Sequence, residues 1–332
     1  MLIFDTLRYD YAMENPVFKE LSQKGLFFER MYSPSTFTNA IMTSVRTGMY
    51  PPRHGWRTWP ESHPIGDNIK TIGSFLEDAG YTVSDDITMP TPFGEDRTEI
   101  YTSNINAFKE KTSQEPFFLY SQYLRIHDGL FRTHRDMTDK NYLSLVSRAG
   151  HYANRAYEYI MRQKFDNEIL FIISSDHGVG LEKERLSSME LDVGAGQIYD
   201  FRNRAYCVFI GRKIKPQVLK SAYSLIDILP SILDYCGIDT TVPDGFLEMQ
   251  GVSVFGDPEP NRYVYMEAQS PYSIWPSEWP NVFGATNGKV KLMLTPEGYK
   301  FYNLVLDPEE EKDLFSGQDI GKALDLIQEI RA

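Results

Sequence analysis

The chain has 332 residues, of which 42% are hydrophobic and 24% charged, a composition typical of a globular protein with one large core and a smaller appendage. Its net charge is −12, whereas proteins that bind nucleic acid usually carry a basic excess, so we expect no nucleic-acid partner. No apolar run reaches the roughly 20 residues needed to cross a bilayer, so we expect no membrane span.

Short apolar runs alternate with helical patterns along most of the chain. The runs that predict strands lie at residues 1–4, 117–124, 168–174, 205–210 and 262–267. The patterns that predict helices lie at residues 16–24, 69–79, 138–164 and 224–235. Asn15 is placed to cap the first of these helices. This alternation predicts an α/β fold, a three-layer α/β/α sandwich with a mostly parallel central sheet.

The composition changes near residue 255, where aromatic residues, proline and glycine become frequent. Short strands are predicted at residues 290–294 and 300–303, followed by a closing helix at 321–331. We therefore expect a main domain over residues 1–254 and a small α+β subdomain over 255–332 packed on it. No basic stretch followed by an apolar one opens the chain, so we expect a cytoplasmic protein, and the abrupt strand at 1–4 suggests a truncated start.

Two of the predicted strands end in an aspartate. Asp5 follows the apolar run LIF, and Asp176 follows IISS and precedes His177. Ligands of open α/β sheets bind beyond the carboxyl ends of the strands, so the two carboxylates are expected to share one crevice. Two carboxylates and an imidazole suit a divalent cation. For either aspartate alone, capping of the next helix is about as well supported as metal binding.

A third motif lies between residues 35 and 55. Thr38 stands where a helix would begin and Gly48 where it would end, so an anionic group beside Thr38 would meet the positive end of a helix. A hydroxyl is a poor nucleophile at neutral pH unless a metal ion or a base activates it. From the local sequence alone, the simpler interpretation of Thr38 is an N-cap.

Together these motifs resemble those of the sulfatase branch of the alkaline phosphatase superfamily. Residues 5–10 resemble the N-terminal signature of that family, residues 38–55 its nucleophile motif and residues 174–178 its second metal motif. Residues 224–238 resemble a late helix of the family, and residues 301–310 its C-terminal subdomain. Each segment alone is weak evidence, but five in the correct order and spacing make the resemblance specific. The fold it implies is the same α/β/α sandwich, with residues 1–254 as the catalytic domain.

The resemblance implies a role for each matching residue. Asp5, Asp176 and His177 would bind a divalent metal ion. Thr38 would be a further ligand of that ion and the covalent nucleophile. Asn39 would help to hold the non-bridging oxygens of the ester. The ligand types leave Zn, Mn, Ca and Mg open as the metal.

A second metal site is doubtful on the same comparison. His127 lines up with a family histidine that serves a second metal or the substrate, although an ordinary loop histidine is an equal alternative. Two-metal members place an aspartate where this chain has Arg125, and a histidine where it has VGAG at 193–196. We therefore expect one metal site, with Arg125 as a candidate for binding the ester oxygens in place of a second cation. Alternative cations nearby are Lys183, Arg185 and His134.

The type of nucleophile separates this chain from ordinary sulfatases. Those need a Cys or Ser that is converted to formylglycine and followed by x-Pro-x-Arg, whereas here Thr38 is followed by Ala40 and Met42 in those places. Oxidation of a threonine would give a ketone, not the aldehyde that acts in sulfatases. A threonine nucleophile instead resembles the phosphodiesterase and phosphoethanolamine-transferase branches of the superfamily.

Three functions remain open from the sequence. The first is a metal-dependent hydrolase or transferase of phosphate or sulfate esters that works through a covalent Thr38 intermediate. The second is a sulfuric-ester hydrolase without formylglycine, and the third is a catalytically silent relative that binds such an ester. The ligand would be a small molecule, a glycan or a lipid headgroup carrying a phosphate or sulfate ester. The sequence predicts no oligomeric state.

Overall fold

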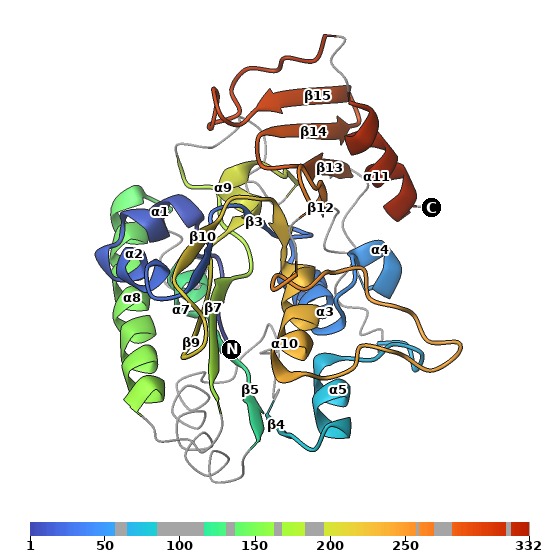
Figure 1. The fold of residues 1–332 in the computed structure, drawn as a ribbon. Helices are drawn as coiled ribbons and strands as arrows, with labels where there is room; N and C mark the ends of the chain where they lie inside the picture. The colour runs from blue at the N-terminus through green and yellow to red at the C-terminus, as the bar shows by residue number, and fades with distance from the viewer. Residues whose placement is uncertain are drawn as a thin grey trace.

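The structure is a computed structural model, which describes residues 1–56, 65–84, 116–130, 137–162, 168–182, 196–256, 259–268, 281–316 and 320–331. Its centre is a six-stranded sheet with the strand order β10-β2-β9-β7-β1-β6. Helices cover both faces of this sheet, and a four-stranded sheet lies beyond one end of it, at the top of Figure 1. The predicted α/β fold with three layers is confirmed.

The central sheet is largely parallel, as predicted. Its strands are β1 (Leu2–Phe4), β2 (Leu26–Phe28), β6 (Ser121–Tyr123), β7 (Leu170–Ser175), β9 (Cys207–Gly211) and β10 (Gln217–Leu219). β1 runs parallel to both β6 and β7, and β10 runs parallel to β2. β9 is the exception, because it is antiparallel to both of its neighbours, β2 and β7.

Two hydrophobic cores lie on opposite faces of the sheet. The helices on one face are α1 (Tyr9–Glu14), α2 (Pro16–Ser22) and α8 (Asp139–Arg162). Those on the other face are α3 (Thr38–Thr47), α5 (Ile72–Asp78) and α10 (Ile228–Cys236). Leu2 and Phe4 of β1 belong to the first core and Ile3 to the second. A strand buried on both faces reads as a continuous apolar run, which explains the sequence LIF before Asp5.

Two of the predicted strands are each divided in the structure. The run at 117–124 forms β5 (Phe117–Leu119), which pairs with β4 (Thr82–Ser84), and then β6, which pairs with β1. The run at 205–210 forms β8 and then β9. A separate three-stranded sheet contains β3 (Met31–Tyr32), β8 (Arg204–Ala205) and β11 (Tyr223–Ser224). An apolar run alone does not show where the chain changes its partner strand.

Local signals fix several helix ends. The side chain of Asn15 caps α2, as predicted, by accepting hydrogen bonds from the backbone N–H groups of Val17 and Phe18. α5 begins later than predicted, because Thr71 and Ser74 form a reciprocal capping box there. Shorter helices are α4 (Pro51–His54), α7 (Arg125–Asp128), α9 (Asp200–Asn203) and the 3-10 helix η3 (Leu225–Asp227). Within the described ranges, no helix combines the length and the apolarity that crossing a membrane requires.

The described residues of the C-terminal part form an antiparallel sheet and a helix. The strands are β12 (Val264–Ala268), β13 (Val282–Thr286), β14 (Val290–Thr295) and β15 (Gly298–Asn303), in that order, and the helix is α11 (Gly321–Arg331). α11 packs beside the sheet, where Ile327 shares a core with Phe283 and Leu292 (Figure 1). The helix has the predicted bounds, and β12, β14 and β15 lie within about two residues of predicted runs, whereas no strand was predicted at β13. The domain boundary at residue 254 stays a prediction.

A buried ion-pair cluster joins this sheet to α9. Lys291 on β14 is 0% exposed, and its Nζ lies 2.6 Å from Asp200 Oδ1 and 2.8 Å from Glu310 Oε1. The same Nζ donates a hydrogen bond to the carbonyl of Ile198 at 3.0 Å. Removing one partner of a buried ion pair leaves an uncompensated charge, which typically costs about 3–5 kcal/mol. The cluster therefore fixes α9 relative to the C-terminal sheet.

Candidate active site

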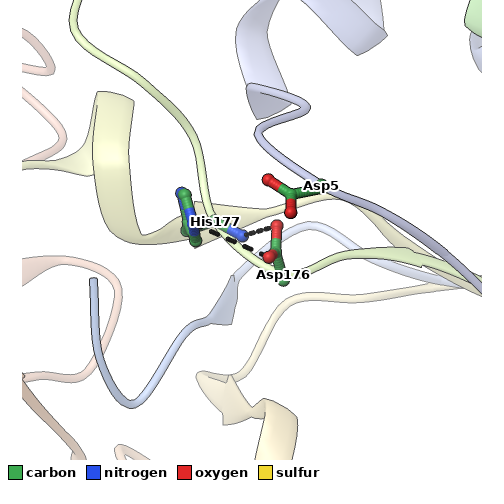
Figure 2. Close-up of side chains that lie close together, drawn as sticks. All are labelled: Asp5, Asp176 and His177. Atoms are coloured by element: carbon green, nitrogen blue, oxygen red, sulfur yellow. Dashed lines mark hydrogen bonds and ion pairs between the residues drawn. The ribbon is translucent and has the colours of Figure 1, made fainter. Parts of the chain in front are cut away.

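Asp5 and Asp176 follow directly on the ends of two neighbouring parallel strands. β1 and β7 are paired so that Phe4 lies opposite Ser175. The next residues in both strands are the two aspartates, which are 4% and 0% exposed. Figure 2 shows the two carboxylates close together, with His177 beside them. The structure thus brings the two strand-end aspartates to one place, as expected from the parallel pairing.

The donor atoms of Asp5, Asp176 and His177 lie within 4.8 Å of one another. Asp176 Oδ1 accepts hydrogen bonds from the backbone N–H groups of Thr6, at 3.0 Å, and His177, at 2.6 Å. Its Oδ2 accepts no hydrogen bond in the described part of the chain, and neither does Asp5 Oδ1. Buried carboxylate oxygens without a donor are costly, and a bound cation would satisfy both of them.

His177 presents a nitrogen lone pair to the same space. Its Nδ1 lies 2.6 Å from the carbonyl oxygen of Gly178, which can only accept a hydrogen bond, so we assign the proton to Nδ1 and the lone pair to Nε2. Histidines that bind metals are commonly oriented in this way, with the second nitrogen donating to a backbone carbonyl. The two carboxylates and this imidazole therefore fit a divalent cation.

Thr38 lies against the histidine. Its Oγ1 is 3.1 Å from His177 Nε2. Two atoms that each lie about 2.1 Å from one tetrahedral or octahedral ion are roughly 3.0–3.4 Å apart, so this spacing fits two ligands of the same cation. Thr38 is the first residue of α3, whose N-cap is Phe37 and which has no side-chain cap. The N-cap interpretation of Thr38 is therefore wrong, and its hydroxyl is directed to the site instead.

Thr6 holds the strand-end turn in a left-handed conformation. Its φ is 61°, which is unusual for a β-branched residue and costs of order 1–3 kcal/mol. Besides its N–H bond to Asp176, Thr6 donates from Oγ1 to the carbonyl of Asp5 at 2.7 Å. The Thr6 carbonyl accepts a hydrogen bond from the hydroxyl of Tyr142 on α8, also at 2.7 Å. These contacts stabilise a turn that aligns the two aspartates.

The electrostatics of Asp5 reflect its position in this cluster. Burial, followed by repulsion from Asp176, raises the pKa of the Asp5 carboxyl to about 8. A further carboxylate, Asp128, also raises this pKa, whereas His127 and Arg202 lower it. Two carboxylates that face each other in a buried place disfavour the doubly ionised state unless a positive charge joins them.

We expect the affinity for a divalent cation to fall as the pH drops below about 8, because Asp5 must lose its proton to bind. A carboxyl with a raised pKa in the folded state has the opposite effect on the metal-free protein. Its contribution to the free energy of unfolding is largest near pH 4 and is lost as the pH rises towards 8, by at most about 1.4 kcal/mol per pH unit.

Denaturant unfolding with EDTA and with saturating Mn²⁺, at several values between about pH 5 and 9, tests this expectation. The stabilisation by Mn²⁺ should grow with pH. Taking the difference between the two series removes the contribution of groups remote from the site, such as Glu310, whose pKa is raised to about 7 by burial. Metal affinity that is independent of pH over this range would contradict the assignment of Asp5 as a ligand.

The other predicted site residues occupy different surroundings. Asn39, which follows Thr38 in α3, is buried. His127 on α7 is close enough to Asp5 to lower its pKa, and its Nδ1 lies 3.5 Å from Asp128 Oδ1. Arg125 is exposed, and its charge partly offsets the burial that raises the pKa of Tyr123 and Tyr152. The roles of Asn39, His127 and Arg125 stay predictions. The alternative cations Lys183, Arg185 and His134 lie outside the described residues.

Two polar side chains at the site were not predicted from the sequence. Gln122 on β6 donates from Nε2 to Asp5 Oδ2 at 3.4 Å. Its strand is paired to β1 with Gln122 opposite Ile3, so the register of the sheet would have revealed it. Arg202 on α9 is 3% exposed and donates from Nη2 to the carbonyl of Thr36 at 3.0 Å. It lies in a four-residue helix without a recognised motif, so the sequence offered no signal.

Three solved structures illustrate what the fold resembles. A 2-O GAG sulfatase has a TM-score of 0.74 and 16% identity, covering 99% of this chain and 89% of that chain. A protein in the alkaline phosphatase superfamily from Vibrio parahaemolyticus has a TM-score of 0.70 and 16% identity, covering 99% and 84%. The phosphonate monoester hydrolase SpPMH from Silicibacter pomeroyi has a TM-score of 0.65 and 15% identity, covering 95% and 90%. At such low sequence identity, the similarity to these structures shows a shared fold and no more.

Comparison of the sequence with families is more specific. No curated protein matches the chain. The sequence model of the family named Sulfatase matches residues 5–84 and 82–238, which together are more than half of the chain. The matched segments include Asp5, Thr38, Asp176 and His177, the residues that the fold brings together. The chain therefore belongs to the sulfatase family of ester hydrolases.

Proposed function

We propose that the protein is a metal-dependent hydrolase of sulfate or phosphate esters in which Thr38 forms a covalent intermediate with the transferred group. The observation that carries this proposal is the contact of 3.1 Å between Thr38 Oγ1 and His177 Nε2, beside two buried carboxylates. A hydroxyl needs activation to act at neutral pH, and the Thr38 hydroxyl adjoins the side chain of a candidate metal ligand, His177.

The cation would be held by Asp5, Asp176 and His177, whose donor atoms lie within 4.8 Å of one another. Asp5 Oδ1 and Asp176 Oδ2 accept no hydrogen bond in the described part of the chain, and His177 Nε2 carries the assigned lone pair. When bound, a divalent cation lowers the pKa of a hydroxyl that it contacts and offsets negative charge on the ester oxygens. Carboxylates, an imidazole and a hydroxyl accommodate Zn, Mn, Ca or Mg, so the intermediate should be sought with each of the four metals.

The reaction would proceed in two balanced displacements. In the first, Thr38 Oγ1 forms a bond to phosphorus or sulfur, the bond to the leaving oxygen breaks, and the threonine proton ends on the released alcohol. In the second, the oxygen of a water molecule attacks the same atom, the bond to Oγ1 breaks, and one proton of the water returns to Oγ1. An acceptor alcohol in place of water would make the enzyme a transferase.

The first turn of α3 would bind the remaining ester oxygens. Helix N-termini bear backbone N–H groups without an intrahelical acceptor, together with the positive end of the helix dipole. Thr38 and Asn39 are the first two residues of this ten-residue helix, so an ester bonded to Oγ1 would lie at that end. We propose that the buried amide of Asn39 contributes a further donor there.

The substrate class is proposed on two grounds. Structural neighbours include a protein in complex with its substrate D-glucosamine-2-N,6-O-disulfate and a phosphonate monoester hydrolase, which favours a sulfate or a phosphate-type ester. Threonine as the nucleophile favours the phosphate-type ester, because the formylglycine chemistry of sulfatases is closed to it. A silent, ligand-binding relative is the alternative, and it is favoured by the sequence at Arg125 and at 193–196, which lacks the second-site ligands of two-metal members.

Trapping of the intermediate tests the proposal. The protein would be loaded with Zn, Mn, Ca or Mg, mixed with aryl phosphate, aryl phosphodiester, aryl phosphonate or aryl sulfate, quenched in acid and examined by mass spectrometry. We expect the peptide that contains Thr38 to gain one phosphoryl or sulfuryl group, and the Thr38→Val variant to gain none. Turnover without any adduct on this peptide in rapid-quench samples would contradict the covalent route. Binding of the esters without turnover would support the silent relative.

A further inference from the structure

Arg202 is a buried cation that contacts the loop leading to Thr38. It lies on α9 and is 3% exposed. Its Nη2 donates a hydrogen bond to the carbonyl of Thr36 at 3.0 Å, two residues before the proposed nucleophile. A buried guanidinium needs negative charge or dipoles around it, and the carbonyl of Thr36 is one such dipole. Its charge acts on Asp5, whose pKa it lowers.

The segment around Arg202 braces both loops of the site. The carbonyl of Arg202 accepts a hydrogen bond of 2.7 Å from the N–H of Gly178, directly after the proposed metal-binding histidine. The side chain of Asn203 donates to the carbonyls of Ser33, at 3.1 Å, and Ser35, at 3.3 Å. Its own carbonyl accepts from the N–H of Ser33 at 2.7 Å. The positions of the nucleophile loop and of the metal loop thus depend on the same two residues.

The charges of the site indicate what a cation would add here. When ionised, Asp5 and Asp176 carry one negative charge each, which a single divalent cation cancels. A site with one metal ion would then have no net positive charge with which to attract an anionic ester. Arg202 is buried against the loop that leads to Thr38, where water screens its charge little. It stands in the place where a fixed positive charge favours the bound anion.

We infer that Arg202 is a positioning residue for the proposed reaction, which holds the turn before Thr38 and adds a fixed positive charge to a one-metal site for binding the ester anion. The inference rests on the proposed function for the chemistry. The effect of Arg202 on the binding of an inorganic anion is independent of turnover, so this inference and the proposed function can fail separately. The position of Arg202 is in turn secured by the C-terminal sheet, because Asp200 of the same helix pairs with Lys291.

Three variants test this inference: Arg202→Met, Arg202→Lys and, as the control, Arg204→Met. Arg204 belongs to the same segment, donates to the carbonyl of Glu29 and stacks on Tyr9. Its loss therefore removes a second guanidinium, which is partly buried and has these contacts in place of one with Thr36. The affinities of the folded proteins for Mn²⁺ and, with Mn²⁺ saturating, for inorganic phosphate would be measured by calorimetry. Values of kcat and KM would be measured on the best ester.

Loss of the charge in Arg202→Met should affect the two ions in opposite directions. We expect phosphate to bind at least about 10-fold more weakly and kcat/KM to fall by about 10²–10³-fold. Mn²⁺ should bind as tightly as before or more tightly, because a positive charge beside its ligands is gone. Arg202→Lys keeps the charge but not the forked geometry, so it should restore phosphate binding more fully than kcat. Arg204→Met should bind both ions like the wild type.

The opposite signs separate this role from mere support of the fold. If Arg202→Met weakens Mn²⁺ and phosphate together, or if it binds phosphate like the wild type, the inference is wrong. If the methionine variant fails to fold, Arg202→Lys provides the test. Equal losses of affinity for Mn²⁺ and for phosphate in the lysine variant would also contradict the inference. A wild type that hydrolyses no ester but binds phosphate through Arg202 would overturn the proposed function and leave this inference in place.

Discussion

Replacement of Thr38 by valine is expected to lower kcat by about 10⁴-fold or more, the usual consequence of removing a covalent nucleophile. Valine keeps the β-branched shape at the start of α3 and removes only the Oγ1 that lies against His177. Affinity for the cation should fall far less than activity, because Asp5, Asp176 and His177 are retained. Steady-state kinetics and calorimetric titration with Mn²⁺ measure the two effects separately.

Two further variants serve as controls for this prediction. Thr38→Ser keeps a hydroxyl at the same place and should retain measurable turnover. Thr43→Val, about one turn along α3, removes a buried hydroxyl that donates to the carbonyl of Asn39 at 2.9 Å, and it should act like the wild type. Normal turnover by Thr38→Val would mean that water attacks the ester directly and that no threonine intermediate forms.

The parts of this site that were predictable are those governed by strand ends. Asp5 and Asp176 were recognised because each follows an apolar run, and parallel pairing of two such strands necessarily brings their carboxyl ends together. The role of Thr38 was ambiguous for the opposite reason. Its contact with His177 joins residues that are 139 positions apart, and no local pattern distinguishes it from a helix cap. Only the packing of α3 decides between the two.

The unpredicted parts depend on irregular or antiparallel segments. β9 lies between β7 and β2 in the reverse direction, although its sequence is as apolar as that of a parallel strand. Arg202 comes just before this strand, on a helix of four residues, where neither period nor capping residues signal burial. Its burial depends on tertiary contacts with the loops that precede Thr38 and follow His177. Such long-range contacts cannot be read from a short window of sequence.

Asp227 shows that a family motif can mark a structural residue as well as a catalytic one. It is 0% exposed and far better satisfied than the aspartates of the site. Its two oxygens accept from the N–H groups of Ser224 and Val252, both at 2.9 Å. They also accept both arms of Arg262, at 2.7 and 2.9 Å. This carboxylate therefore connects the start of η3 with the segments that follow α10.

The contrast predicts opposite outcomes for two buried aspartates. Asp176→Asn should weaken binding of Mn²⁺ by at least about 100-fold, and activity with it, because a charged ligand is lost. The metal-free protein should keep or increase its free energy of unfolding. Oδ1 of the asparagine still accepts hydrogen bonds from the N–H groups of Thr6 and His177. The amide nitrogen replaces Oδ2, which accepted no hydrogen bond in the described part of the chain, and the charge repulsion with Asp5 disappears.

Asp227→Asn should do the reverse. It leaves the Arg262 guanidinium without its buried counterion, so the free energy of unfolding should fall by about 3–5 kcal/mol, while the folded fraction still binds Mn²⁺. Urea unfolding in EDTA, together with metal titration, compares the two variants directly. If Asp176→Asn destabilised the metal-free protein as much as Asp227→Asn does, the Asp176 carboxylate would be structural, and the cation site proposed between it and Asp5 would have to be abandoned. If Asp176→Asn instead increased the free energy of unfolding, the Asp176 carboxylate would be one that is retained for metal binding although it lowers the stability of the fold.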